Sequence, residues 1–131
     1  MATLPALSDE EAPPEARLVF QDIRTKRNTD YVNNFWRALA HDPAELRAVW
    51  EKALAVMAPG ALDPLVKELV YVAASVTNGC AYCVHSHTAA ARAKGMTSEM
   101  YSELLAVLAM AMQTNALATP MGVEVDERFK A

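Results

Sequence analysis

Two cysteines and a histidine stand at a spacing that can support thiol chemistry. The only cysteines of the chain, Cys80 and Cys83, form a Cys-x-x-Cys pair, and His87 follows four residues after the second. In a helix, which turns about 100° per residue, these three side chains share one narrow stripe, and His87 can lie over the Cys83 sulfur. His85 falls on the opposite face of such a helix. His87 is therefore the histidine that is placed to act on the thiols.

The predicted position of the pair at the start of a helix favours reactive thiols. Unpaired backbone N–H groups and the positive end of the helix dipole stabilise a thiolate there. A sulfenic acid on one cysteine can be captured as a disulfide by the other. A neighbouring imidazole can take the proton and return it. The spacing thus predicts a redox-active pair.

Glu68 is a further candidate, in the middle of the helix predicted before the cysteines. Its neighbours one and two turns on are Val72 and Ser75, and a carboxylate turned inward with them needs a partner. His87 is the obvious partner across the turn between the two helices. The alternative is a pair of Lys67 and Glu68 on a solvent-exposed helix face.

Two other interpretations of the cysteines stay open. Two thiolates, His87 and either His85 or Glu68 would make a nominal four-ligand metal set. Because the chain has no second Cys or His pair, and His85 points away, we predict no metal and no cofactor. The remaining interpretation is two inert buried thiols, since free cysteine is among the most buried residue types.

Composition narrows the class of protein. The chain has 131 residues, of which just over half are apolar, and a formal net charge of -4, as expected for one domain with a real core. It has no basic stripe that would indicate nucleic acid, and no apolar run that approaches a membrane span. Residues 1–5 lack the features of a signal peptide, so we expect a cytoplasmic protein. In that reducing compartment, a lone Cys-x-x-Cys favours catalysis or metal binding over a structural disulfide.

The apolar residues follow a helical period along the chain, and no alternating pattern typical of a strand extends beyond a few residues. We predict an all-α, single-domain bundle of about six helices joined by short turns, with a flexible or loosely docked arm over residues 1–13, the helical domain over 14–120 and a tail over 121–131. The expected helices begin at Pro14, at a cap on Asn34, at about Pro43, at Pro64 after Asp63, at Cys80, and at a cap on Thr97 or Ser98.

Apolar positions indicate which helix faces are buried. In the first helix we expect Val19 and Ile23 to be buried. Four aromatic residues are expected in the core, namely Phe35, Trp36, Trp50 and Tyr71. The helix over 43–58 carries a regular apolar stripe at i, i+3, i+4 and i+7 spacing. For the helix that starts at Pro64, the expected core face is Leu65, Val66, Leu69, Val70, Ala73 and Val76.

The combined spacing Glu68-(x)11-Cys80-x2-Cys83-x3-His87 resembles the signature of the alkyl hydroperoxidase D (AhpD) core, within the carboxymuconolactone decarboxylase-like superfamily. The stretches over 32–40 and 60–69 are also similar, so the resemblance covers roughly residues 30 to 110. It implies an all-α fold and thiol-dependent reduction of hydroperoxides without metal, flavin or haem. The decarboxylase branch lacks the Cys-x-x-Cys pair, which argues against lactone decarboxylation.

The resemblance also implies roles for single residues. Cys83 would be the peroxidatic thiol and Cys80 the resolving one. His87 would be the acid–base partner of Cys83, and Glu68 would complete a proton relay to it through water. Tyr82 stands where the archetype has a histidine, and we assign it to the substrate pocket. Trp36 is the best candidate to line the apolar entrance to the thiols, as a second pocket residue.

We therefore predict a thiol-dependent peroxidase of the alkyl hydroperoxide reductase type, acting on a small hydroperoxide. Its reductant would be an unknown dithiol, such as a lipoyl-bearing or thioredoxin-like protein. The alternatives are a disulfide reductase with little peroxidase turnover, or a non-enzymatic metal-binding or redox-sensing helical module. We expect a homo-oligomer, a trimer or hexamer by resemblance, because the helix over 98–112 offers more apolar surface than a small bundle can bury.

Overall fold

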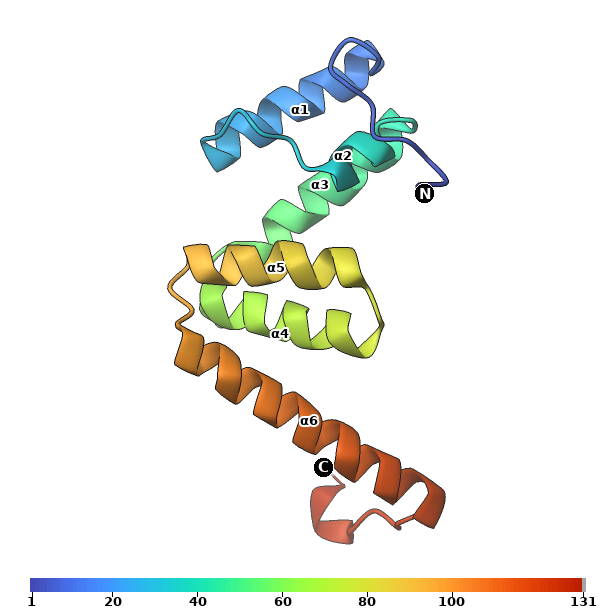
Figure 1. Ribbon diagram of the computed structural model, residues 1–131, viewed down its shortest axis with the longest axis vertical. Helices are drawn as coiled ribbons and strands as arrows, with labels where there is room; N and C mark the ends of the chain where they lie inside the picture. The colour runs from blue at the N-terminus through green and yellow to red at the C-terminus, as the bar shows by residue number, and fades with distance from the viewer. Residues whose placement is uncertain (131) are drawn as a thin grey trace. The chain divides into compact units, whose positions relative to one another are not determined.

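The computed structural model describes residues 1–130, and its regular structure is entirely helical. The prediction of an all-α fold with about six helices is confirmed, since these residues contain no strand. The elements are α1 (Pro14–Arg27), α2 (Asn34–Leu39), α3 (Pro43–Met57), α4 (Pro64–Thr77), α5 (Ala81–Ala93), α6 (Ser98–Met121) and the 3-10 helix η1 (Glu127–Phe129) (Figure 1).

The chain divides into two compact units, Met1–Ala58 and Pro59–Ala131. The first unit contains α1, α2 and α3, and the second contains α4, α5, α6 and η1. The predicted tail over 121–131 begins at the last residue of α6 and includes η1, while Ala131 lies outside the described residues.

The first unit has its own apolar core. Val19 and Ile23 are buried in it, as predicted. Trp36 and Trp50 meet edge to face, with ring centroids 5.3 Å apart. The indole nitrogen of Trp50 donates a hydrogen bond to Asp22 at 2.7 Å. The buried members of this core are Ala12, Ala16, Val19, Phe20, Ile23, Val32, Trp36, Ala40, Leu46 and Trp50.

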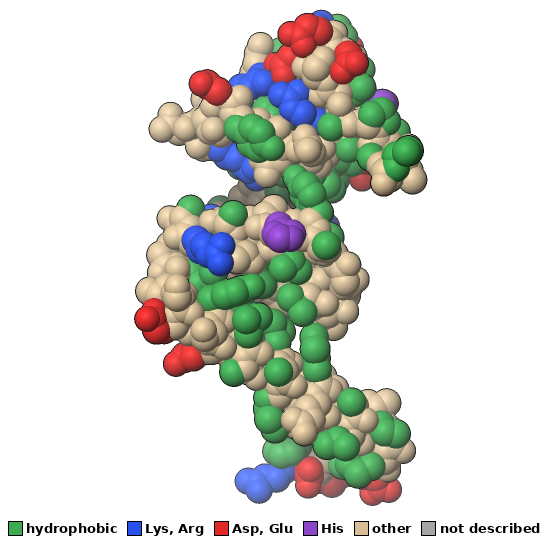
Figure 2. All heavy atoms as spheres, viewed as in Figure 1, with side chains coloured by type: hydrophobic (Ala, Val, Ile, Leu, Met, Phe, Trp, Pro, Cys, Tyr) green, Lys and Arg blue, Asp and Glu red, His purple; other side chains and the backbone are tan. Residues whose placement is uncertain are grey.

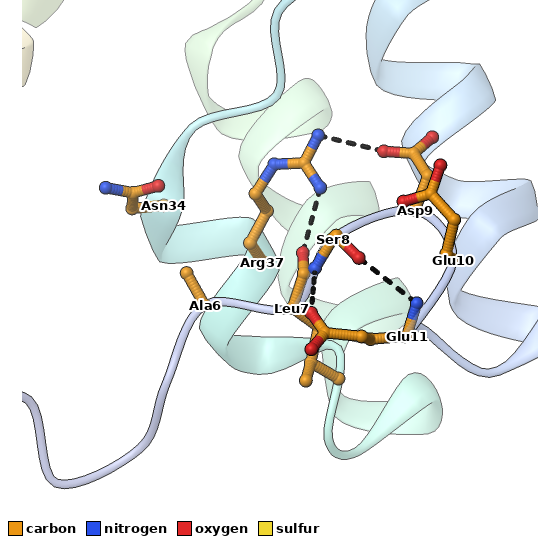
Figure 3. Close-up of a pocket in the computed structure, with 8 residues that line it drawn as sticks. All are labelled: Ala6, Leu7, Ser8, Asp9, Glu10, Glu11, Asn34 and Arg37. Atoms are coloured by element: carbon orange, nitrogen blue, oxygen red, sulfur yellow. Dashed lines mark hydrogen bonds and ion pairs between the residues drawn. The ribbon is translucent and has the colours of Figure 1, made fainter.

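The N-terminal segment is docked on α1 and α2, whereas the sequence indicated a flexible or loosely docked arm. Asp9 forms an ion pair with Arg24 of α1 at 2.7 Å. It forms a second one with Arg37 of α2 at 2.9 Å, and Arg37 also donates to the Leu7 carbonyl (Figure 3). The hydrogen bond from Arg24, opposed by burial and assisted by Arg37, lowers the pKa of Asp9 to about 2. The open depression in this region is lined by arm residues together with two residues of α2. It contains none of the predicted site residues.

In the second unit, α4 and α5 form a helical hairpin and lie side by side (Figure 1). Asp63 caps α4 by accepting a hydrogen bond from the Leu65 N–H at 2.9 Å, and Pro64 takes the first helical position, as predicted. Gly79 provides the turn with a left-handed φ of 71°, which favours glycine. The Cys80 N–H then donates to the Ser75 carbonyl at 2.9 Å, which closes the hairpin.

The residues predicted to form the buried face of α4 are not the ones that its own chain buries. The buried residues of α4 are Glu68, Val72 and Ser75, whereas Val66 and Val70 are 40% and 57% exposed. Hydrophobic periodicity identifies an apolar stripe, but α5 packs on the neighbouring stripe that carries the carboxylate. The apolar stripe of α4 is therefore only partly covered by its own chain.

Helix α6 is long, apolar and unburied. Thr97 caps it by accepting from the Met100 N–H at 3.1 Å, which fits one of the two predicted caps. None of the residues over Ser98–Met121 is buried, and apolar side chains are visible along it in Figure 2. By length and composition alone α6 could cross a membrane, contrary to the expectation that no apolar run approaches a membrane span. The core helix of a soluble protein can have the same length and composition.

Candidate active site

Cys80 and Cys83 are joined by a disulfide at the start of α5, with their Cα atoms 5.3 Å apart. The helix begins at Ala81, one residue later than predicted, and Cys80 is its N-cap. The Cys80 sulfur accepts a hydrogen bond from the Cys83 N–H at 3.3 Å. Both cysteines are half-buried. The cysteine pair therefore lies at a helix N-terminus, as predicted. After reduction, this position stabilises a thiolate.

Glu68 and His87 meet directly between α4 and α5. Glu68 is only 4% exposed, and its Oε2 lies 2.7 Å from Nδ1 of His87. A carboxylate can only accept hydrogen bonds, so Nδ1 carries the hydrogen and Nε2 is left as the nitrogen that can exchange a proton. The structure thus brings together the two residues that were predicted to interact. The contact is direct, without the water that was expected between them.

Lys94 is a third member of this cluster, and it was not among the predicted site residues. Its Nζ lies 3.1 Å from Oε1 of Glu68, so each carboxylate oxygen has its own partner. Burial, the largest single influence, raises the pKa of Glu68, but the hydrogen bonds and charges of His87 and Lys94 outweigh it and hold the pKa below its ordinary value. A sequence signal existed, because Lys94 follows His87 by seven residues, which is two helical turns on the same face.

Tyr71 holds the imidazole from a second direction. Its ring stacks on the ring of His87, with centroids 3.5 Å apart and planes inclined by 17°. Tyr71 comes one turn after Glu68 on α4, so one face of that helix supplies both contacts. Tyr71 was expected in the core, but it is 41% exposed. Stacking and hydrogen bonding together fix the plane and the direction of the His87 ring.

The other predicted residues lie elsewhere. His85 is exposed on α5, as its helical position predicted, and Tyr82 is 44% exposed between the two cysteines. Trp36 is part of the core of the first unit, so its predicted role at the entrance to the thiols stays a prediction. Over residues 1–130, no group of three or more His, Cys, Asp or Glu side chains is arranged to hold a metal ion.

Comparisons with known proteins identify the family of the chain. The model of the carboxymuconolactone decarboxylase family matches residues 43–122. The alkyl hydroperoxide reductase AhpD of Solibacter usitatus is 37% identical over 84 residues, which are 64% of this chain and 42% of that protein. An uncharacterised protein of Cupriavidus necator is 35% identical over 86 residues, 66% of this chain and 75% of that protein. The chain thus spans less than half the length of the Solibacter relative.

One solved structure matches along the whole chain. The crystal structure of the alkylhydroperoxidase AhpD core from Rhodospirillum rubrum superposes with a TM-score of 0.96 at 54% sequence identity. The match covers 100% of this chain and 98% of that one. The likeness therefore extends to both compact units and to all six α-helices.

Proposed function

Because the chain belongs to the carboxymuconolactone decarboxylase family, we propose that it is a thiol-dependent hydroperoxide reductase of the AhpD type. The AhpD-like family and fold that the Glu, Cys, Cys, His spacing predicted are confirmed by the family match and by the Rhodospirillum rubrum structure. One observation carries the proposed chemistry. A Cys80–Cys83 disulfide lies at a helix N-terminus, one turn before an imidazole that a buried carboxylate holds.

In the first proposed step, the Cys83 thiolate attacks the terminal oxygen of a hydroperoxide. The sulfur–oxygen bond forms as the O–O bond breaks, which gives a sulfenic acid on Cys83 and an alkoxide that leaves as the alcohol after it gains a proton. The helix N-terminus favours the thiolate. His87, four residues on, supplies the proton exchange through Nε2, while Glu68 holds Nδ1.

In the second proposed step, the Cys80 thiol attacks the sulfenic sulfur of Cys83. A disulfide forms, and the hydroxyl leaves as water. The Cys80–Cys83 disulfide of the structure supports this step, because it is the bond that the step would form. An external dithiol then reduces it by two thiol–disulfide exchanges and becomes a disulfide itself. We propose a lipoyl-bearing or thioredoxin-like protein as that reductant, because such dithiols are available in a reducing cytoplasm, where we place the enzyme.

The proposal is tested by single-turnover oxidation of the reduced protein. Hydrogen peroxide and alkyl hydroperoxides of increasing size are added in equimolar amounts, and the peptide that contains Cys80 and Cys83 is analysed by mass spectrometry. We expect the loss of two hydrogens from this peptide and one equivalent of alcohol. Oxidation by small disulfides with no reaction towards any peroxide would instead favour a disulfide reductase. Stoichiometric zinc that survives dialysis of the reduced protein would favour a metal-binding module.

A further inference from the structure

Lys94 lies at the C-terminal end of α5 and contacts a buried carboxylate on α4. It is the C-cap residue of the helix, and its Nζ lies on Oε1 of the buried Glu68. The Lys94 side chain is 38% exposed, whereas the Glu68 side chain that its ammonium contacts is 5% exposed. A cation at a helix C-terminus is also favoured by the dipole. The ion pair joins α5 to α4 over a separation of 26 residues, so it depends on the packing of the two helices.

Two side chains, His87 and Lys94, act on the charge of Glu68. Two helices contact α4 in the second unit, namely α5 and α6. From α5, His87 and Lys94 bind the carboxylate. Within the described part of α6, no side chain forms a hydrogen bond or ion pair with Glu68, and on α4 itself Tyr71 stacks on His87. Lys94 is thus the permanent positive charge that compensates the buried carboxylate.

We propose that Lys94 is a positioning residue for the redox site, an inference that rests on the proposed function. Its ammonium keeps Glu68 ionised and turned so that Oε2 accepts from Nδ1 of His87. Nε2 then remains the proton acceptor for the Cys83 thiol. On this arrangement, Glu68 orients the imidazole and does not take up the proton.

The consequence of losing Lys94 follows from hydrogen-bond chemistry. Without the ammonium, a hydrogen bond and a positive charge that lower the pKa of Glu68 are lost, so this pKa rises. A protonated Glu68 becomes a donor, so Nδ1 of His87 must accept and the hydrogen moves to Nε2. That tautomer cannot take a proton from Cys83. A rise in the pKa of Glu68 would therefore move the acid side of the pH profile of thiol oxidation to higher pH.

The test compares Lys94→Met, Lys94→Arg and the control Lys52→Met, which removes the same charge from an exposed position on α3. Single-turnover peroxide oxidation is measured from pH 4 to pH 9, and the Glu68 carboxyl and the His87 nitrogens are followed by NMR. We expect Lys94→Met to move the acid limb up by about one pH unit, with Glu68 and the His87 tautomer changing together. Lys94→Arg and Lys52→Met should follow the wild type.

The outcomes separate this inference from the proposed function. If the wild type reduces peroxide and the Lys94→Met profile superimposes on it, the positioning role is wrong. If no variant reduces peroxide but Glu68 still titrates at higher pH in Lys94→Met, the positioning role stands and the peroxidase proposal fails. A Glu68 titration that is unchanged in Lys94→Met overturns the inference whatever the activity.

Discussion

At the scale of single residues, the two cysteines differ in their position relative to α5. Cys80 precedes the helix as its N-cap, whereas Cys83 lies in the first turn. By helical spacing His87 lies one turn beyond Cys83 on the same face, so we propose that its imidazole serves Cys83 rather than Cys80. This asymmetry supports the proposed division into a peroxidatic Cys83 and a resolving Cys80.

The division of roles predicts different outcomes for two serine variants. We expect Cys83→Ser to abolish peroxide consumption, because it removes the attacking thiolate. Cys80→Ser should keep one turnover and accumulate a sulfenic acid on Cys83, since no second thiol can resolve it. Dimedone trapping followed by mass spectrometry distinguishes the two. A sulfenic acid trapped on Cys80 in the Cys83→Ser protein, with no turnover in Cys80→Ser, would reverse the assignment.

The direct contact between Glu68 and His87 predicts that their contributions are not independent. Glu68→Gln and His87→Gln should each slow single-turnover thiol oxidation by about 100-fold. The double variant should be no slower than the worse single variant by more than about threefold, because residues that act as one unit are non-additive. His85→Gln is the matched control and should leave the rate unchanged. Multiplicative losses in the double variant would show that the two residues act separately.

At the scale of elements, the α4–α5 hairpin brings the site together. Glu68 and His87 are separated by 19 residues, and the turn over 78–80 folds one helix back on the other. Gly79 adopts φ of 71° there, a conformation that costs side-chain-bearing residues free energy. The site therefore depends on a backbone feature that takes no part in the chemistry.

Gly79→Ala should lower the free energy of unfolding by about 1 kcal/mol, because alanine disfavours the left-handed region. The added Cβ would meet no atom within 4 Å, so the cost is in the backbone alone. Gly60→Ala is the matched control, since Gly60 lacks a positive φ and its Cβ would lie an ordinary 3.5 Å from Lys67 Nζ. Urea unfolding measures both. Equal midpoints for the two variants would show that the turn tolerates a side chain.

At the scale of the whole molecule, the second unit exposes apolar surface on two helices. None of the residues of α6 is buried, and the apolar stripe of α4 is only partly covered. Large apolar patches left exposed usually mark an interface, and identical subunits close by rotational symmetry. We propose that copies of this chain cover these faces in a trimer or hexamer, and a dimer is the nearest alternative.

A charge on α6 should dissociate this assembly. Val107 is 65% exposed, so Val107→Glu leaves an isolated chain intact, whereas the half-buried Leu108 would confound the result. We expect the mass from light scattering at micromolar concentration to fall towards the 14.3 kDa of one chain. Gln113→Glu adds the same charge at an exposed polar position and should stay assembled. A folded wild-type protein that already has the mass of one chain would refute the oligomer.

The sequence by itself determined the features that depend on near neighbours. Pro64, Asp63 and Thr97 set helix starts because caps and prolines act within one turn, and the cysteine spacing placed Cys83 and His87 on one face. It also paired Glu68 with His87, because an inward carboxylate needs a partner.

Only the tertiary structure decided which face of α4 is buried, that Lys94 and Tyr71 complete the site, and that Asp9 ties the arm to α1 and α2. These features depend on how one helix is rotated against another. An apolar stripe has the same period whether its own chain or another molecule covers it. Periodicity therefore leaves that rotation open, and packing fixes it.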